Sequence, residues 1–320
     1  MKKYGVRRLG SILLFTALAA QLAAGAQAPA ARYRAFDPKG NAVTLRNIID
    51  SLGRADVLFV GETHDDPVAH LLEAELLRRA DEAYGPSSPR RRAVALSLEM
   101  FERDVQTILD EYLAGLITER HFLLGSRPWG NYETDYRPLV EYARAHHLPV
   151  IAANAPARYV SRVSGGGPDS LRSLPPVAVK SWLPPLPFPP ASEGYAAKFN
   201  RFMGGAGAAP ATGTSPTAQA SPHGGPHLLE AQTLRDASMA YAISEHLKRG
   251  RDPLVVQVNG TFHSEGRMGV PEQLARYRPK ARAVVVTVVP ADAFPDFDAS
   301  TQGRLGDFVI ITDPAVKSSR

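Results

Sequence analysis

Two histidines occupy the same position relative to a predicted buried strand. Gly61 and His64 follow the apolar residues 57–60, and Gly260 and His263 follow residues 254–259. In each case the glycine lets the chain turn tightly where a strand ends. Two such motifs in a chain with nine histidines favour a functional site. For either histidine alone, a buried ring hydrogen-bonded to backbone groups is the structural alternative.

Carboxylates and amides end the same group of predicted strands. Parallel strands bring their carboxyl ends together, and ligands of open α/β sheets collect there. We therefore expect one crevice to contain two carboxylates, two imidazoles and two amides, namely Glu62, His64, Glu99, Asn154, Asn259 and His263.

Two kinds of chemistry fit this set of side chains. Glu62, His64, Glu99 and His263 could bind a divalent metal, since oxygen and nitrogen ligands suit zinc, manganese or iron. They could equally transfer protons without a metal, with Glu62 or Glu99 as the base and a histidine as the acid.

Glu99 is the least easily explained of these residues, because a carboxylate at a strand end is costly to bury unless it is paired. Its structural alternative is a salt bridge to Arg103 or Arg127.

The strands that would position these residues are continuous apolar runs separated by helical stretches. Such runs are typical of parallel strands covered on both faces. The pattern predicts an α/β fold, a mainly parallel sheet flanked by helices. The expected strands are 57–60, 93–98, 149–153, 254–258, 283–289 and 308–311, and the expected helices are 67–80, 104–116, 138–147 and 230–248.

The helix predicted at residues 67–80 is amphipathic. Its apolar face contains Leu71, Leu72, Leu76 and Leu77, and its polar face contains Glu73 among other charged residues. Asp65 or Asp66 is placed to cap it ahead of Pro67.

Between residues 159 and 226 the alternation of strands and helices stops. We interpret this span as a smaller, mainly helical subdomain inserted into the α/β domain, whose two parts are residues 29–158 and 227–320. A helix is expected at 192–203. The stretch 204–225 is rich in Gly, Ala, Ser, Thr and Pro and is expected to be mobile, because it has little apolar surface to bury.

Residues 1–28 have the features of a Sec-type signal peptide: a basic start, an apolar segment and small residues at the cleavage site. The expected location is periplasmic or secreted. The chain has no cysteine, which excludes a cysteine-linked lipid anchor, disulfides and thiolate metal ligands. Cleavage would leave a net charge of about +1, because four bases and no acids precede residue 28, so nucleic acid is not an expected partner.

Five segments resemble the ChaN-like haem-binding uptake proteins, within the superfamily that includes Tiki proteases and erythromycin-esterase-like enzymes. The resemblance covers most of residues 50–290. The segments are Val57–Asp65, Ser97–Arg103, Asn154–Ala157, Gln232–Ala240 and Asn259–His263. Members of the family often carry a lipoprotein cysteine, which this chain lacks.

The resemblance implies an exported haem carrier for iron uptake, with haem bound on the subdomain side through a tyrosine. Tyr195 is the first candidate and Tyr132 the second, while His227 and Asn259 are further candidate contacts. Lys198 or Arg201 could meet the propionates at the rim. The expected partner is haem or another small molecule. A second copy of the chain, forming a homodimer, and membrane uptake machinery are further possible partners.

The Tiki branch implies the alternative, a metal-dependent hydrolase that uses the paired Gly-x-x-His motifs with Glu62 and Glu99. Unrelated activities share one architecture, so the fold alone does not separate the two functions.

Overall fold

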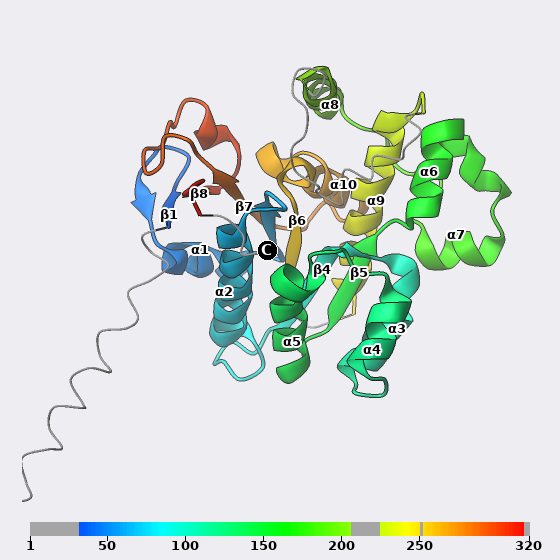
Figure 1. Cartoon of the computed structure of the whole chain (residues 1–320), viewed down its shortest axis with the longest axis horizontal. Coiled ribbons are helices and arrows are strands. Elements are labelled where there is room, and N and C mark those ends of the chain that lie inside the picture. Colours follow the sequence, from blue (N-terminus) through cyan, green and yellow to red (C-terminus); the bar gives the residue numbers. More distant parts are fainter. Residues whose placement is uncertain (1–31, 206–224, 250–251, 317–320) are drawn as a thin grey trace, which may run out of the picture.

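The computed structural model describes residues 32–205, 225–249 and 252–316. In these ranges the chain forms an eight-stranded sheet with the order β2-β1-β8-β7-β3-β6-β4-β5 (Figure 1). The strands are β1 (Tyr33–Phe36), β2 (Ala42–Val43), β3 (Val57–Glu62), β4 (Ala93–Glu102), β5 (Val150–Asn154), β6 (Pro253–Gly260), β7 (Ala283–Pro290) and β8 (Phe308–Thr312).

The six strands predicted from the sequence, β3 to β8, are all present and pair in parallel. The sequence did not predict β1 and β2. These two short strands pair antiparallel at the β8 side of the sheet. The predicted fold class, a mainly parallel sheet flanked by helices, is confirmed.

Helices separate the strands along the chain. Five were not predicted individually (α1, α4, α6, α7 and α10), and none of those described has the length and apolar character needed to cross a bilayer. The helices are α1 (Leu45–Ser51), α2 (Pro67–Tyr84), α3 (Gln106–Leu113), α4 (Glu119–Ser126), α5 (Arg137–Ala145), α6 (Ala157–Gly166), α7 (Pro176–Trp182), α8 (Glu193–Gly205), α9 (Leu228–His246) and α10 (Val270–Tyr277).

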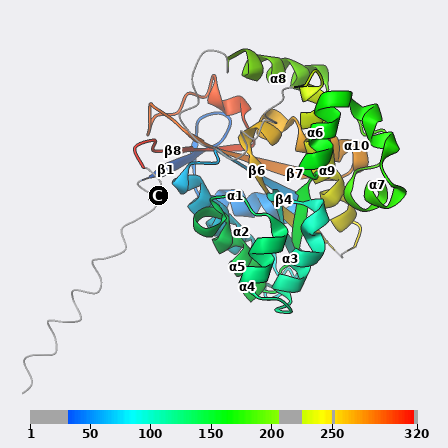
Figure 2. The ribbon, with the colours of Figure 1, turned by 45° about the vertical axis from the view of Figure 1, so that its right-hand side comes forward.

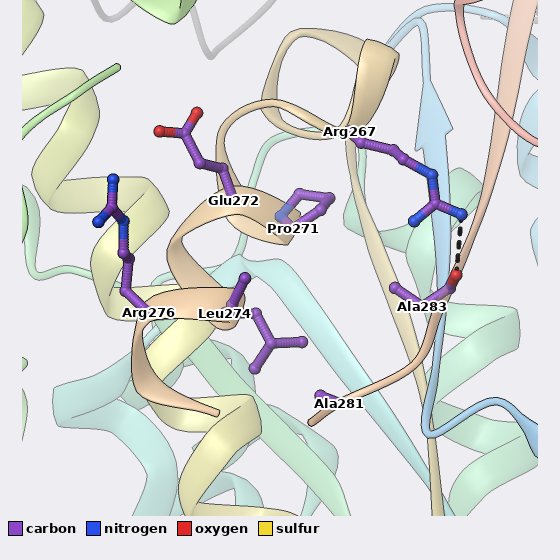
Figure 3. Close-up of a pocket in the computed structure, with 8 residues that line it drawn as sticks. Arg267, Pro271, Glu272, Leu274, Arg276, Ala281 and Ala283 are labelled. Atoms are coloured by element: carbon purple, nitrogen blue, oxygen red, sulfur yellow. Dashed lines mark hydrogen bonds between the residues drawn. The ribbon is translucent and has the colours of Figure 1, made fainter. Parts of the chain in front are cut away.

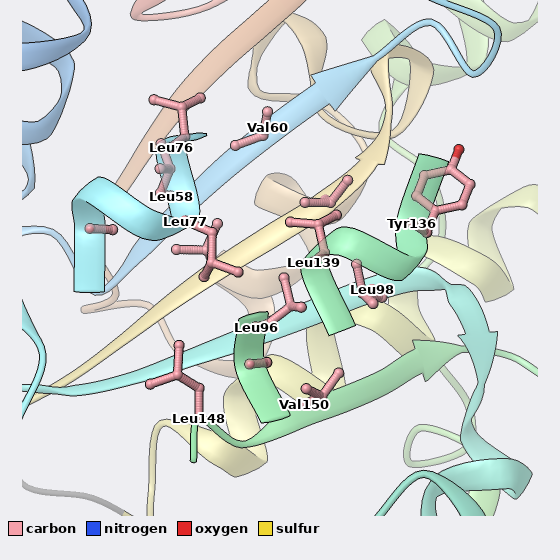
Figure 4. Close-up of a cluster of buried hydrophobic side chains, with 14 of the residues drawn as sticks. Leu58, Val60, Leu76, Leu77, Leu96, Leu98, Tyr136, Leu139, Leu148 and Val150 are labelled. Carbon is pink, nitrogen blue, oxygen red and sulfur yellow. The ribbon is translucent and has the colours of Figure 1, made fainter. Parts of the chain in front are cut away.

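Both faces of the sheet are covered by apolar helix surfaces. Figure 4 shows one face, where leucines of β3 and β4 pack against leucines of α2 and α5. On the other face, Met239 and Ile243 of α9 and Leu274 of α10 pack on Val57 and Phe59 of β3. Each fully buried side chain of this size contributes about 1.5–3 kcal/mol to folding, so the two layers fix the strand positions.

The start of α2 follows the predicted capping, but its faces do not follow the predicted pattern. Asp66 accepts hydrogen bonds from the backbone N–H groups of Val68 and Ala69, at 2.9 and 3.3 Å. Glu73, assigned to the polar face, is completely buried, and Leu71, assigned to the apolar face, is 57 % exposed. The helix is therefore rotated relative to the prediction, and it presents a carboxylate to the interior.

A buried arginine joins the amino ends of the central strands. Arg92, just before β4, is 3 % exposed. Its guanidinium donates to the carbonyl oxygens of Leu52 at 2.9 Å, Ala55 at 2.7 Å and Pro253 at 2.8 Å. The Leu52 carbonyl also accepts from the Ala55 N–H at 3.1 Å, so the guanidinium is a second donor there. At the Ala55 and Pro253 carbonyls it supplies a donor to acceptors at the start of the sheet.

Helices α6, α7 and α8 lie between β5 and α9 in the chain. Part of this region has its own core, in which Val163 and Leu171 pack against Leu234 of α9. In Figures 1 and 2 α8 lies apart from the helices that cover the sheet faces. The division into domains stays a prediction. The predicted signal segment 1–28 and most of the stretch 204–225 lie outside the described residues.

Candidate functional site

Glu62, His64, Glu99 and His263, four of the six residues predicted to converge, lie on three adjacent strands and the turns that follow them. β6 pairs with both β3 and β4, and Glu62 of β3 is in register with Gly260 of β6. Regular pairing of β4 with β6 ends at Leu98, so Glu99 follows at the point where the strands separate. Glu62, Glu99 and the two Gly-x-x-His turns thus share one edge of the sheet.

Glu62 is the last residue of β3 and is 1 % exposed. One carboxylate oxygen accepts a hydrogen bond from the Tyr136 hydroxyl at 2.7 Å and lies 2.8 Å from Nδ1 of His64. The other oxygen lies 3.0 Å from Nδ1 of His70, a residue of α2. The carboxylate therefore orients the His64 ring and also contacts a second, deeper histidine.

His263 is held by carboxylates on both sides of its ring. Its Nδ1 lies 2.6 Å from Asp236 of α9, and its Nε2 lies 3.3 Å from Glu99. The Tyr195 hydroxyl donates to the second oxygen of Asp236. All four side chains are buried, so Tyr195, Asp236, His263 and Glu99 form a continuous hydrogen-bonded chain from α8 to β4.

Gly260 brings the two histidine systems together. Its backbone N–H donates to Glu99 at 2.8 Å. A Cβ atom at this position would lie 2.7 Å from Nε2 of His64, so the imidazole packs directly on the glycine backbone. The glycine is needed here for space, because its φ of −57° is open to any residue.

The carboxylates set the charge of His263 and Glu99. Burial lowers the pKa of His263, but the charges of Glu99 and Asp236 outweigh burial and raise this pKa to about 10. Burial raises the pKa of Glu99, but the positive charge of His263 outweighs burial and lowers it to about 2. At neutral pH the two groups are therefore an imidazolium and a carboxylate.

The pKa of His64 is also raised. Burial lowers it, and the hydrogen bond and charge of Glu62, together with the charge of Glu99, outweigh that effect. Because 16 % of the His64 side chain is exposed, this is the histidine of the pair that solvent reaches more easily.

The structural alternatives for these residues do not hold. Arg127 binds Glu102 and Asp104, and Arg103 stacks on Tyr241, so Glu99 pairs with a histidine and not with either arginine. His64 and His263 are oriented by carboxylates and not by backbone groups.

The predicted haem contacts are not gathered at one place. Tyr195 is 2 % exposed and bonded to Asp236. Tyr132 is equally buried, among Phe101 and Phe122, and its hydroxyl has no hydrogen-bond partner in the described part of the chain. Asn259 is buried, with its amide nitrogen donating to the Gly260 carbonyl. His227, at the start of α9, has 38 % of its side chain exposed.

Four residues that complete the site were not predicted: His70, Glu73, Tyr136 and Asp236. One signal was available for Glu73. Residues 69, 72, 73, 76 and 80 have helical spacing and are all buried, so Glu73 lies within the apolar stripe of α2. For Asp236 the helical spacing gave no signal, because buried residues occur on most sides of α9. Its position within the segment Gln232–Ala240, which resembles the family, was the signal available.

The outer surface of α8 is apolar at its end. Phe202 is 60 % exposed and Met203 is 42 % exposed. The Phe202 ring packs on Phe262, the residue before His263, with centroids 5.2 Å apart. Lys198, considered above as a propionate contact, is buried and donates to the Phe262 carbonyl at 2.8 Å. It anchors α8 over the turn after β6.

A shallow pocket of about 330 Å³ lies away from this edge of the sheet. It is formed by α10 and the first residue of β7, and Arg267 donates to the Ala283 carbonyl on one side (Figure 3). Ala283 begins β7, so the pocket is near the amino ends of the parallel strands. Because β7 runs parallel to β3, the pocket is at the opposite end of the strands from the charged residues at their carboxyl ends.

Comparison with known proteins identifies the family. The family model described as haem-binding uptake, Tiki superfamily, ChaN matches residues 48–274, which is more than half of the chain. The chain belongs to this ChaN family. The resemblance in the sequence is thereby confirmed. A protein of Arabidopsis thaliana, Protein RETICULATA-RELATED 5, chloroplastic, is 26 % identical in an alignment of 261 residues that covers 78 % of this chain. The chain spans 33 % of the length of that relative.

One solved structure shares the fold. The structure titled "Cofacial heme binding to ChaN of Campylobacter jejuni" superposes with a TM-score of 0.59 and 15 % identity, covering 88 % of this chain and 97 % of that one. A mutant of the erythromycin esterase EreC is more distant, with a TM-score of 0.46, 12 % identity, and coverage of 88 % and 83 %. The ChaN-like architecture agrees with the α/β fold described above.

Proposed function

We propose that this member of the ChaN family is an exported haem-binding protein that serves haem and iron uptake. The match of residues 48–274 to the haem-binding family carries the proposal. The basic and apolar residues at the start of the chain support export, with a periplasmic or secreted location after cleavage of residues 1–28.

The exposed end of α8 fits part of what haem requires. Haem is a large apolar plane with two propionates. Phe202 and Met203 offer an apolar surface, and the exposed Arg201 offers a positive charge beside it. We infer that the porphyrin packs on these residues. When bound, haem supplies an iron centre that needs a ligand from the protein.

The predicted tyrosine ligands do not lie on this surface, because Tyr195 faces Asp236 and Tyr132 is enclosed by aromatic rings. His227 and Met203 are exposed and carry donor atoms that haem iron accepts, so we propose them as the ligands to test first.

Hemin titration tests this surface. Phe202→Asp is expected to weaken hemin binding at least about tenfold, because losing the contact of one phenyl ring costs about 1.5–3 kcal/mol. His227→Ala and Met203→Ala should each be compared with wild type for a shift of the Soret band, which reports the iron ligand.

The control is Leu124→Asp. Leu124 is 72 % exposed on α4, at the end of the molecule opposite α8 in Figures 1 and 2. It should bind hemin like wild type. Equal affinities for Phe202→Asp and wild type would exclude the α8 surface, and hemin binding no stronger than that of an unrelated exported protein of similar charge would exclude the function.

A second function is favoured by the two carboxylate-held histidines at the strand ends. We propose that the site can hydrolyse a bound ester, amide or related bond. His263 is an imidazolium at neutral pH with both ring nitrogens facing carboxylates, so we propose that its positive charge stabilises negative charge developing on the bound group. His64, once deprotonated, is placed to accept the proton of an attacking water. It can then pass this proton to the leaving group. Because the pKa of His64 is raised, such activity should increase only as the pH rises through a value above the ordinary 6.5 of histidine.

Gly260→Ala is expected to lower any hydrolysis about 100-fold, because the new Cβ would displace the His64 imidazole. Turnover of p-nitrophenyl acetate and of a mixed peptide pool, each measured against pH, checks this. Gly165→Ala is the matched control, since nothing lies within 4 Å of its added Cβ. If Gly260→Ala and wild type hydrolyse both probes at the same rate, His64 has no part in the reaction. If wild type hydrolyses neither p-nitrophenyl acetate nor the peptides, His64 and His263 do not catalyse hydrolysis of esters or amides of these kinds.

A further inference from the structure

Three buried side chains form a second cluster behind the strand-end residues. Glu62 of β3 meets His70 and Glu73 of α2, and all three have 6 % exposure or less. One ligand atom from each lies within 4.8 Å of the other two. Among the described residues this is the group with metal-ligand geometry, and it shares only Glu62 with the ligand set predicted from the sequence.

The polar atoms that face the centre of this cluster lack hydrogen-bond partners in the described part of the chain. They are both carboxylate oxygens of Glu73, one oxygen of Glu62 and Nδ1 of His70. Glu73 has no exposed surface, and leaving a buried charge without a partner is among the most costly arrangements in a folded protein. Either a bound cation or extra protons on His70 and Glu73 must therefore balance the two carboxylates at this point.

The histidine is oriented as a metal ligand. Its Nε2 lies 3.2 Å from the carbonyl oxygen of His64 and 3.4 Å from a carboxylate oxygen of Asp135. Both are acceptors, so they favour a proton on Nε2, which leaves the lone pair of His70 Nδ1 free. Metal-binding histidines typically donate a hydrogen bond from the ring nitrogen that does not bind the metal, and this bond fixes the tautomer.

One of the two ligand distances already fits a small cation. Ligands at bond lengths of about 2.0–2.2 Å in tetrahedral geometry are about 3.3–3.6 Å apart. His70 Nδ1 is 3.5 Å from Glu73, within this range, and 3.0 Å from Glu62, so the imidazole and the Glu62 carboxylate must separate by a few tenths of an ångström when the cation binds.

We propose that Glu62, His70 and Glu73 bind one divalent transition-metal cation, of the zinc, manganese or ferrous iron class. The two carboxylates neutralise its charge, and the imidazole supplies the nitrogen ligand. This site is separate from the haem surface on α8. It is also separate from the His64 and His263 pair, although Glu62 contacts His64 with its other oxygen.

The competing explanation is a shared proton in place of the cation, with Glu73 neutral and His70 charged. Glu73→Gln separates the two, because an amide resembles a protonated carboxyl but removes an anionic ligand. The purified full-length protein is loaded with Zn²⁺, Mn²⁺ or Fe²⁺, dialysed and analysed for metal. We expect about one ion per chain in wild type and a loss of at least tenfold in occupancy in Glu73→Gln.

Two further variants define the site. Glu82→Gln removes a carboxylate from the exposed side of the same helix, where Glu82 pairs with Arg78, and should keep full occupancy. His263→Gln should keep the metal as well, because His263 lies in the other cluster. Chelation should lower the melting temperature of wild type and leave that of Glu73→Gln unchanged.

Several results would overturn the proposal. Wild type that retains none of the three ions and melts at the same temperature with and without them has no such site. Two results for Glu73→Gln would support the shared proton. One is metal binding equal to that of wild type. The other is a variant without metal that is as stable as wild type measured without chelator. Loss of the metal in His263→Gln places it at the strand ends instead.

Discussion

Substituting methionine for Arg92 is expected to lower the free energy of unfolding by about 3–5 kcal/mol. Methionine fills much of the space but donates no hydrogen bond, so the carbonyls of Leu52, Ala55 and Pro253 lose the guanidinium, and only that of Leu52 keeps a backbone donor, the Ala55 N–H at 3.1 Å. Each unsatisfied buried acceptor costs about 1–3 kcal/mol. Urea denaturation followed by far-ultraviolet circular dichroism measures the change.

Arg90→Met is the matched control. Arg90 stacks over the ring of Tyr84, as Arg92 does, but it is exposed. Its replacement should cost less than about 1 kcal/mol. Similar losses in the two variants would show that stacking on Tyr84, and not the bonds to the three carbonyls, is what Arg92 contributes.

Asp236→Asn is expected to cost about 3–5 kcal/mol at pH 7, since it removes the buried charge that His263 faces. It should also change the pH dependence. The folded-state pKa of His263 is about 10, above its ordinary value, so its stabilisation is complete below about pH 6.5 and is lost as the pH rises through 10. Wild-type stability should therefore fall between pH 7 and 10, by at most about 1.4 kcal/mol per pH unit from this group.

In Asp236→Asn the pKa of His263 should be lower, so its contribution to the slope should end at a lower pH. Tyr195→Phe, which removes only the hydroxyl that donates to Asp236, should cost about 1–2 kcal/mol. Asp110→Asn, at an exposed position, should have no measurable effect. A wild-type stability that is constant from pH 7 to 10 would show that His263 is not held as an imidazolium.

The sequence was sufficient for most of the sheet, because β3 to β8 are continuous apolar runs and their carboxyl ends must meet. That argument placed Glu62, His64, Glu99 and His263 along one edge. It could not supply β1 and β2, which have only four and two residues: β1 pairs with β8, far away in the sequence, and β2 pairs with β1.

The sequence was less informative about the interior of the site. A charged residue is normally assigned to the outer face of an amphipathic helix, and that assumption misplaced Glu73. Tyr195 was selected by resemblance as an iron ligand, and only the packing of α8 on α9 shows that its hydroxyl meets Asp236. Such contacts depend on helix rotation and on pairs of residues far apart in the chain, which composition and local spacing do not encode.

The position of β8 has a consequence for synthesis of the protein. β8 is the last described strand to leave the ribosome, yet it lies between β1 and β7. Until residues 308–312 are available, β1 can pair only with β2, and β7 is an open edge. Unpaired edges invite association with other chains. A nascent chain that stops before residue 308 is therefore the form most dependent on chaperones, however complete its helices are.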